Sequence, residues 1–183
     1  HYSGLPYIRT NNTTKIAKEL GRFIFYAIAV TALILFLLFR SLYAVIFPLI
    51  VVGAGVVWSV GSLAIFGYDM TILTGLIPPL IIVIGIPNCI FFLNKYHDEY
   101  KTHGNQSKAL TRMVQKIGVV TFLTNITTAI GLGVCSVTSS PVLREFGIIS
   151  SINVMSTYII SIIFFPVIFS YLPPPSYRST KHL

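Results

Sequence analysis

Apolar residues occur along the chain in runs of about twenty, separated by short polar segments. A helix of about 20 residues, rising 1.5 Å per residue, crosses the ~30 Å hydrocarbon core of a bilayer. The runs therefore predict an all-α, polytopic transmembrane helix bundle. Its five spans are expected at about residues 23–39, 43–66, 71–96, 117–137 and 146–172.

The third run is interrupted by Pro78, Pro79 and Pro87. Proline is tolerated in the first turn of a helix, where its missing N–H has no intrahelical partner. We therefore expect the main part of this span to begin at Pro78, after a short re-entrant or extended piece. Asn88 would then lie near the bilayer midplane.

The one long polar connection, residues 95–116, predicts a further helix that lies on the cytoplasmic membrane surface. From Ser107 onward, apolar residues such as Leu110 and Met113 fall on one side of a helix and basic residues on the other. This pattern is typical of an interfacial amphipathic helix. The basic residues expected to contact lipid are Lys108, Arg112 and Lys116.

Composition supports a membrane protein, because 54% of the residues are apolar, only 10% are charged and the mean hydropathy is +0.80. The chain carries 13 Lys and Arg against 5 Asp and Glu, for a net charge of +8. On alternating sides of five spans, eight of the 13 lysines and arginines fall on the side of the 95–116 connection. The positive-inside rule therefore predicts that the N-terminus is extracytoplasmic and the C-terminus cytoplasmic. We expect a multi-pass protein of the plasma (inner) membrane. Membrane lipid, and not nucleic acid, is the expected partner.

No predicted span contains an Asp, Glu, Lys, Arg or His in its interior. An intramembrane aspartyl protease needs two facing carboxylates, and a serine hydrolase needs a histidine beside its nucleophile, so we expect no enzyme and no cofactor. The run His97-Asp98-Glu99, with His103, fits no strong metal signature. A solvated loop is the favoured interpretation, and no metal site is expected.

The spans do carry uncharged polar residues, which recur at spacings of three and four and so form stripes on helix faces. One interpretation is interhelical hydrogen bonding, worth on average about 0.6 kcal/mol per contact. The other is a polar seam between moving helices, or the wall of a water-accessible transport path. The candidate residues are Pro87, Asn88, Thr121, Thr124, Asn125, Thr128, Ser150, Asn153 and Thr157.

Several segments, in this order and spacing, resemble the resistance-nodulation-division (RND) transporters, and within them the MMPL and Patched-like branch with a sterol-sensing-type membrane domain. The resemblance extends from about residue 20 to 175. The matching segments are residues 39–41 (FRS), 85–88 (GIPN), 92–96 (FLNKY) with Glu99, 109–110 (AL), 124–131 (TNITTAIG) and 145–147 (EFG).

The resemblance implies that the chain, which opens on His1 without an initiator Met, is a piece of a larger protein. Residues 1–20 would end an extracytoplasmic domain, residues 21–175 would be the second to sixth helices of one transporter half, and residues 176–183 would be a cytoplasmic tail. The complete protein would export lipids or other hydrophobic or amphiphilic compounds, driven by protons. Its partners would be membrane lipid, such a substrate and the other half of the transporter, with a homo-oligomer left open.

One position departs from the family pattern. Where many relatives carry acidic residues, this chain has Pro87-Asn88, neither of which titrates near neutral pH. The family's threonines near that site are kept as Thr124, Thr127 and Thr128. We therefore expect the half that lacks the titrating acids, with Asn88 bonding across the interface to the other half and Pro87 kinking its helix.

Two alternatives stay open. Sterol-sensing domains share the five-helix unit, so the chain could be a lipid sensor or scaffold. Protein-translocation subunits of the related secretion type also contain a six-helix unit. Carboxylates in the missing half would favour the pump, and the sequence before His1 would distinguish the secretion type.

Overall fold

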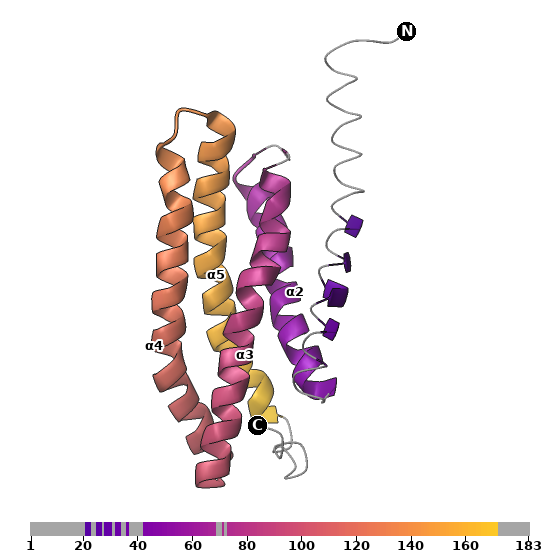
Figure 1. Ribbon diagram of the computed structural model, residues 1–183, viewed down its shortest axis with the longest axis vertical. Helices are drawn as coiled ribbons and strands as arrows, with labels where there is room; N and C mark the ends of the chain where they lie inside the picture. The colour runs from indigo at the N-terminus through magenta and orange to yellow at the C-terminus, as the bar shows by residue number, and fades with distance from the viewer. Residues whose placement is uncertain are drawn as a thin grey trace.

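Four long helices dominate the computed structural model (Figure 1). They are α2 (Leu42–Ile65), α3 (Ile77–His103), α4 (Gln106–Gly133) and α5 (Pro141–Tyr171), with 3-10 segments η1 (Thr74–Leu76) and η2 (Val134–Val137) before α3 and after α4. Each long helix is long and apolar enough to cross a membrane. The structure describes residues 21–22, 25–26, 28–30, 32–33, 36, 42–68, 71 and 73–171. Within these residues the all-α prediction is confirmed.

The predicted first span, residues 23–39, is described only in part. Its described residues are helical: 25–26, 28–30, 32–33 and 36, preceded by helical residues 21–22. The predicted end of an extracytoplasmic domain at 1–20, the motif at 39–41 and the tail at 176–183 lie outside the described residues.

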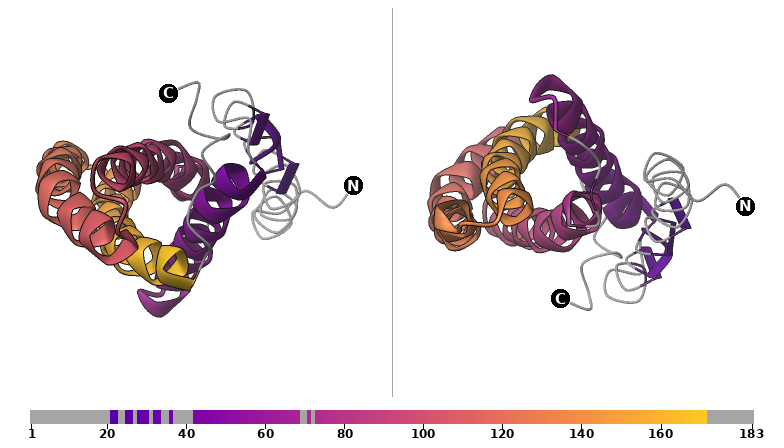
Figure 2. Two further views of the ribbon diagram at one scale, coloured as in Figure 1. Left: turned by 90° about the horizontal axis from the view of Figure 1, so that it is seen from below. Right: turned by 90° about the horizontal axis from the view of Figure 1, so that it is seen from above.

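Helices α3 and α5 lie between α2 and α4. α2 and α4 each contact both α3 and α5, and α3 also contacts α5, whereas no described residues of α2 and α4 touch each other. Viewed end-on, α2 and α4 occupy opposite sides of the bundle (Figure 2). The α2–α3 and α4–α5 connections lie at one end of the bundle and the α3–α4 turn at the other (Figure 1).

Small residues allow the three helices α2, α3 and α5 to approach closely around Thr157. A Cβ added at Gly55 on α2 would lie 3.3 Å from the Thr157 Oγ1 atom. One added at Gly85 on α3 would lie 3.1 Å from Val52 Cγ2 and 3.5 Å from Thr157 Cγ2. Small residues serve this purpose in membranes, where lipid gives no hydrophobic drive for helices to associate.

The prediction of a separate surface helix in residues 95–116 is wrong. α3 continues to His103, the turn consists of Gly104 and Asn105, and α4 begins at Gln106. Gly104 takes the left-handed conformation (φ 63°) that glycine adopts without steric cost, and the Asn105 side chain accepts a hydrogen bond from the Lys108 N–H. The helical pattern from Ser107 joins the following span because no proline interrupts it.

The apolar side of this first part of α4 faces protein. Ala109, Leu110 and Met113 are buried and belong to the same core cluster as Phe92 of α3 and Phe165 of α5. The stripe that predicted a surface helix therefore packs against neighbouring helices.

Other boundaries differ by a few residues. η1 replaces the expected re-entrant or extended piece, and α3 starts at Ile77 with proline in its first turn, as expected. α4 gives way to η2 at Val134, and α5 starts at Pro141 instead of residue 146. A proline at a helix start costs no hydrogen bond, so the loop signal Ser140-Pro141 marked the start of this helix.

Candidate functional site

Two buried asparagines connect α3 and α4. Asn88 is 3% exposed and Asn125 is 1% exposed, and the Asn88 Nδ2 atom donates to Asn125 Oδ1 at 3.2 Å. Asn125 Nδ2 in turn donates to the Thr121 carbonyl at 2.7 Å, one helical turn earlier. The structure thus brings together three predicted site residues, Asn88, Thr121 and Asn125, in one buried group.

Asn88 therefore does not face outward, where we expected it to bond to another half of the transporter. Adjacent residues of a helix point about 100° apart, and here Pro87 is exposed while Asn88 is buried. The exposed face of α3 also carries Val83 and Phe91. Asn88 instead meets Asn125, a partner on another helix that the sequence pattern of α3 alone could not reveal.

The threonines of α4 point in another direction. Thr124 and Thr127 are exposed and Thr128 is partly buried. Their hydroxyls donate to carbonyls four residues earlier, those of Val120, Leu123 and Thr124, at 2.8–3.0 Å. Because each hydroxyl oxygen can still accept a hydrogen bond, these side chains leave acceptors on the outer face of α4.

A second polar group joins α2 and α5. Ser62 Oγ and the Asn153 side chain are paired by two contacts, at 3.1 Å to Oδ1 and 2.9 Å to Nδ2. Thr157 and Ser161 extend this face of α5, each donating to a carbonyl four residues earlier at 2.8 Å. All four side chains are buried.

Ser150 lies on the same face of α5 and is 0% exposed, yet its hydroxyl has no hydrogen-bond partner among the described residues. Ser62 was not among the predicted site residues. Its spacing of three from Ser59, another buried serine, is the signal that would have indicated an inward polar face on α2.

The expected single seam is thus two separate groups. Asn88, Asn125 and Thr121 lie between α3 and α4, while Asn153, Thr157 and Ser150 lie on the face of α5 that meets α2 and α3. In the described part of the chain no hydrogen bond joins the two groups. Pro87 and Thr124 belong to neither, because both are exposed.

An ionic cluster lies near the α3–α4 turn, around the buried carboxylate of Glu99. Lys116 Nζ lies 2.8 Å and Lys95 Nζ 3.3 Å from Glu99 Oε1, and Arg112 Nη1 lies 3.8 Å from Oε2. Lys95 also lies 3.8 Å from Asp98. The sequence did not single out Glu99 as a centre, because two of its partners come from the following helix.

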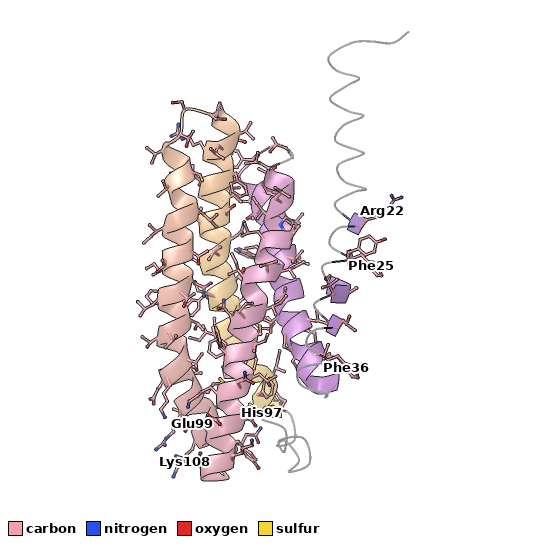
Figure 3. All side chains as sticks on the ribbon, viewed as in Figure 1. Arg22, Phe25, Phe36, His97, Glu99 and Lys108 are labelled. Atoms are coloured by element: carbon pink, nitrogen blue, oxygen red, sulfur yellow. The ribbon has the colours of Figure 1, made fainter. Side chains whose placement is uncertain are left out.

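The solvated loop expected around His97 and Glu99 is instead the last part of α3, and Glu99 is buried. They are two residues apart on α3 and so project from nearly opposite faces, as Figure 3 shows near the α3–α4 turn. Across the described ranges, no three His, Cys, Asp or Glu side chains gather in a metal-binding group.

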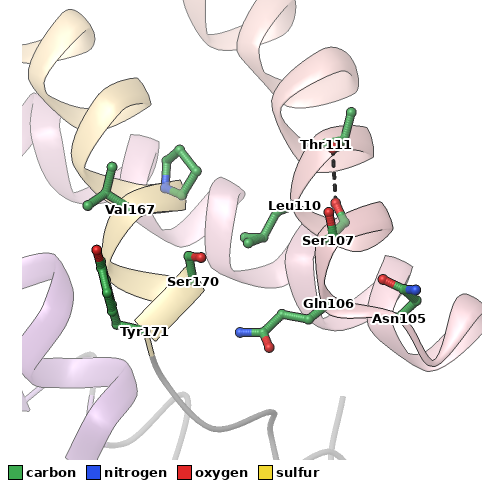
Figure 4. Close-up of a pocket in the computed structure, with 9 residues that line it drawn as sticks. Asn105, Gln106, Ser107, Leu110, Thr111, Val167, Ser170 and Tyr171 are labelled. Atoms are coloured by element: carbon green, nitrogen blue, oxygen red, sulfur yellow. Dashed lines mark hydrogen bonds between the residues drawn. The ribbon is translucent and has the colours of Figure 1, made fainter.

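An open cavity of about 700 Å³ lies between the start of α4 and the end of α5 (Figure 4). The Gln106 amide reaches α5 here and donates to the Phe169 carbonyl. Polar side chains including Asn105, Thr111 and Ser170 line much of it. The cavity is at the same end of the bundle as Glu99, and not beside either buried polar group.

Comparison with known proteins identifies the family of this helical bundle. Residues 3–181 match the MMPL family. The chain belongs to the MMPL family. A curated protein of Methanocaldococcus jannaschii, whose name describes it only as a membrane protein, is 23% identical over 136 residues. This alignment covers 74% of the chain and 35% of that relative, so the chain spans about a third of the relative's length. No solved structure matches the chain.

As an MMPL family member, the chain is a membrane domain of the RND type and belongs to an integral, multi-pass membrane protein. The family resemblance drawn from the sequence motifs is confirmed. In this MMPL domain Pro87 lies on the exposed face of α3 and Asn88 lies in the bundle interior. The family resemblance implies acidic residues at these two positions.

Proposed function

We propose that the chain is the membrane domain of a proton-driven exporter of lipids or other amphiphilic compounds, and not an enzyme. Within that exporter it would be the half without titrating acids. The proposal is supported by the MMPL family match and by Pro87-Asn88, which stand where the family resemblance implies acidic residues. Pro87 and Thr124 are exposed on α3 and α4 and carry no carboxylate.

On this proposal the same face of α3 and α4 contacts the other half of the transporter. Val83 is 68% exposed and Phe91 48% exposed, and the hydroxyls of Thr124 and Thr127 lie outside the bundle. A face that mixes apolar side chains with hydroxyl acceptors suits another transmembrane helix, because small and hydroxyl-bearing residues favour helix contacts in lipid. Acids on the opposing half would then be within reach of the threonine oxygens.

Cysteine cross-linking in the full-length protein tests the interface. In a background without Cys89 and Cys135, Pro87→Cys, Phe91→Cys and Thr124→Cys are each expected to cross-link to cysteines on the equivalent helices of the other half. Trp58→Cys is the matched control, because Trp58 is 51% exposed but lies on α2. Cross-linking from Trp58 and not from α3 would refute the proposed interface.

Reconstituted vesicles test the function. An imposed proton gradient is expected to drive transport of a labelled amphiphile in the wild type, and Asn88→Leu is expected to reduce transport without changing membrane insertion. Saturable lipid binding without gradient-driven flux would favour the sensor instead. A full-length protein without any intramembrane carboxylate would exclude proton-driven export.

A further inference from the structure

The basic residues near the α3–α4 turn are only partly neutralised by Glu99. The side chain of Glu99 is 5% exposed, whereas those of Arg112 and Lys116 are 48% and 56% exposed. Each cation therefore contacts the carboxylate on one side and remains open on the other. Arg112 is held at 3.8 Å from Oε2 and Lys116 at 2.8 Å from Oε1.

The charge balance of this cluster favours an anion. Lys95, Arg112 and Lys116 surround Glu99, and Asp98, which is 73% exposed, lies beside Lys95 alone. Lys108 lies one turn before Arg112 and has no ion pair among the described residues. The surface of α4 thus carries excess positive charge. The two acidic residues lie on α3, where Glu99 is buried and Asp98 pairs with Lys95.

The position of these basic residues along α4, next to exposed apolar residues, indicates the kind of anion. Residues four apart lie on one helix face, so Lys108, Arg112 and Lys116 form a ridge. The next two turns expose Val119, Val120 and Leu123 at 60%, 53% and 57%. A helix of 28 residues is about 42 Å long, which exceeds the ~30 Å hydrocarbon core, so one end of α4 reaches the headgroup layer.

We propose that Arg112 and Lys116 bind the phosphate of an anionic phospholipid whose acyl chains lie along Val119, Val120 and Leu123. Guanidinium groups bind phosphate oxygens through two parallel hydrogen bonds, and ammonium groups bind them as point charges. Glu99 acts as a positioning residue, because it holds both cations at the edge of the α3–α4 contact. Val120 and Leu123 lie one turn before Thr124 and Thr127, so the lipid would lie beside the proposed contact with the other half, nearer the α3–α4 turn. The site itself requires only that the chain spans a membrane.

Lipid binding to the full-length protein in detergent tests the site, with native mass spectrometry counting bound phosphatidylglycerol and phosphatidylcholine. Wild type is expected to prefer phosphatidylglycerol, and Arg112→Gln/Lys116→Gln to lower that preference by about fivefold per charge removed. The matched control, Lys101→Gln/Arg144→Gln, removes two basic residues away from the ridge and is expected to keep the preference. Equal binding of the two lipids by wild type, or an equal loss in the control, would overturn the site.

Two further arms separate the alternatives. Inorganic phosphate at the same concentration is expected not to displace phosphatidylglycerol, and displacement would mean a site for free anions instead of lipid. Glu99→Gln removes a negative charge, so simple electrostatics predicts tighter phosphatidylglycerol binding. We expect weaker binding, because the cations lose their fixed positions, and tighter binding would overturn the positioning role.

Discussion

Asn88 on α3 donates a hydrogen bond to Asn125 on α4 at 3.2 Å, and both side chains are almost completely buried. The two residues are 37 positions apart in the sequence and belong to different predicted spans. Asn88 therefore faces its own bundle, while its neighbour Pro87 faces outward.

A double-mutant cycle on this pair measures its contribution to stability. Asn88→Leu leaves the Asn125 Oδ1 atom unpaired in the bundle, and we expect it to lower the free energy of unfolding by about 1 kcal/mol. Asn88→Leu/Asn125→Leu is expected to cost less than the sum of the single variants, with a coupling of about 0.6 kcal/mol. Reversible unfolding in mixed detergent micelles gives these values. Strict additivity would mean that the bond does not form.

In the polar group between α2 and α5, two serine-to-alanine substitutions are expected to have different effects on the unfolding temperature. Ser62→Ala removes a hydroxyl that contacts Asn153 at two atoms, so we expect a lower unfolding temperature. Ser150→Ala removes a buried hydroxyl that has no partner among the described residues, so we expect an unchanged or higher unfolding temperature. Thermal unfolding in detergent compares the two. A clear loss for Ser150→Ala would reveal a bound partner, such as an ordered water.

Gly147 provides a test of close packing between α5 and η2. A Cβ at this position would lie 2.8 Å from Ser136 N and 2.9 Å from the Leu132 carbonyl oxygen, and backbone atoms cannot move aside cheaply. We expect Gly147→Ala to cost about 1–3 kcal/mol, the usual range for overpacking. Gly131→Ala is the control, since nothing lies within 4 Å of its Cβ position. It should stabilise α4 slightly by restricting the unfolded backbone.

Accessibility labelling tests the predicted orientation. In the background without native cysteines, Lys101→Cys near the α3–α4 turn should react with a membrane-impermeant thiol reagent only after the cells are opened. Ser139→Cys lies in the opposite connection, between η2 and α5, and should react in intact cells. This expectation follows from the excess of lysine and arginine in residues 95–116. The reverse labelling pattern would invert the topology.

The sequence predicts many of the buried polar residues of the site, but it does not predict which of them bond to each other. Asn88, Asn125 and Asn153 stand out because polar side chains are rare in spans, and all three are buried. Their partners depend on how the helices rotate against each other. The stripe containing Thr121, Thr124 and Asn125 divides accordingly, with Thr124 outside the bundle and the other two inside.

The helix boundaries near residues 95–116 also could be predicted only in part from the sequence. The charges at Lys95 and Lys116 predict the ends of two hydrophobic spans, but they do not end the helices: α3 continues to His103 and α4 begins at Gln106. Because Glu99 is paired with Lys95, Arg112 and Lys116, charges on α3 and α4 stabilise one continuous helical hairpin. A single-sequence pattern does not show such pairs between helices.

The sequence by itself determined that this chain is an all-α membrane domain of the MMPL family, because runs of about twenty apolar residues have one stable arrangement in lipid, in which each backbone group is satisfied within its helix. It also placed Pro87-Asn88, neither of which titrates near neutral pH, where the family resemblance implies acidic residues. Only the tertiary structure decided that Asn88 turns inward to Asn125, that Ser62 meets Asn153, and that Glu99 collects cations from two helices. These contacts depend on the rotation and spacing of neighbouring helices, which glycines such as Gly55 and Gly85 set through packing rather than through any local pattern.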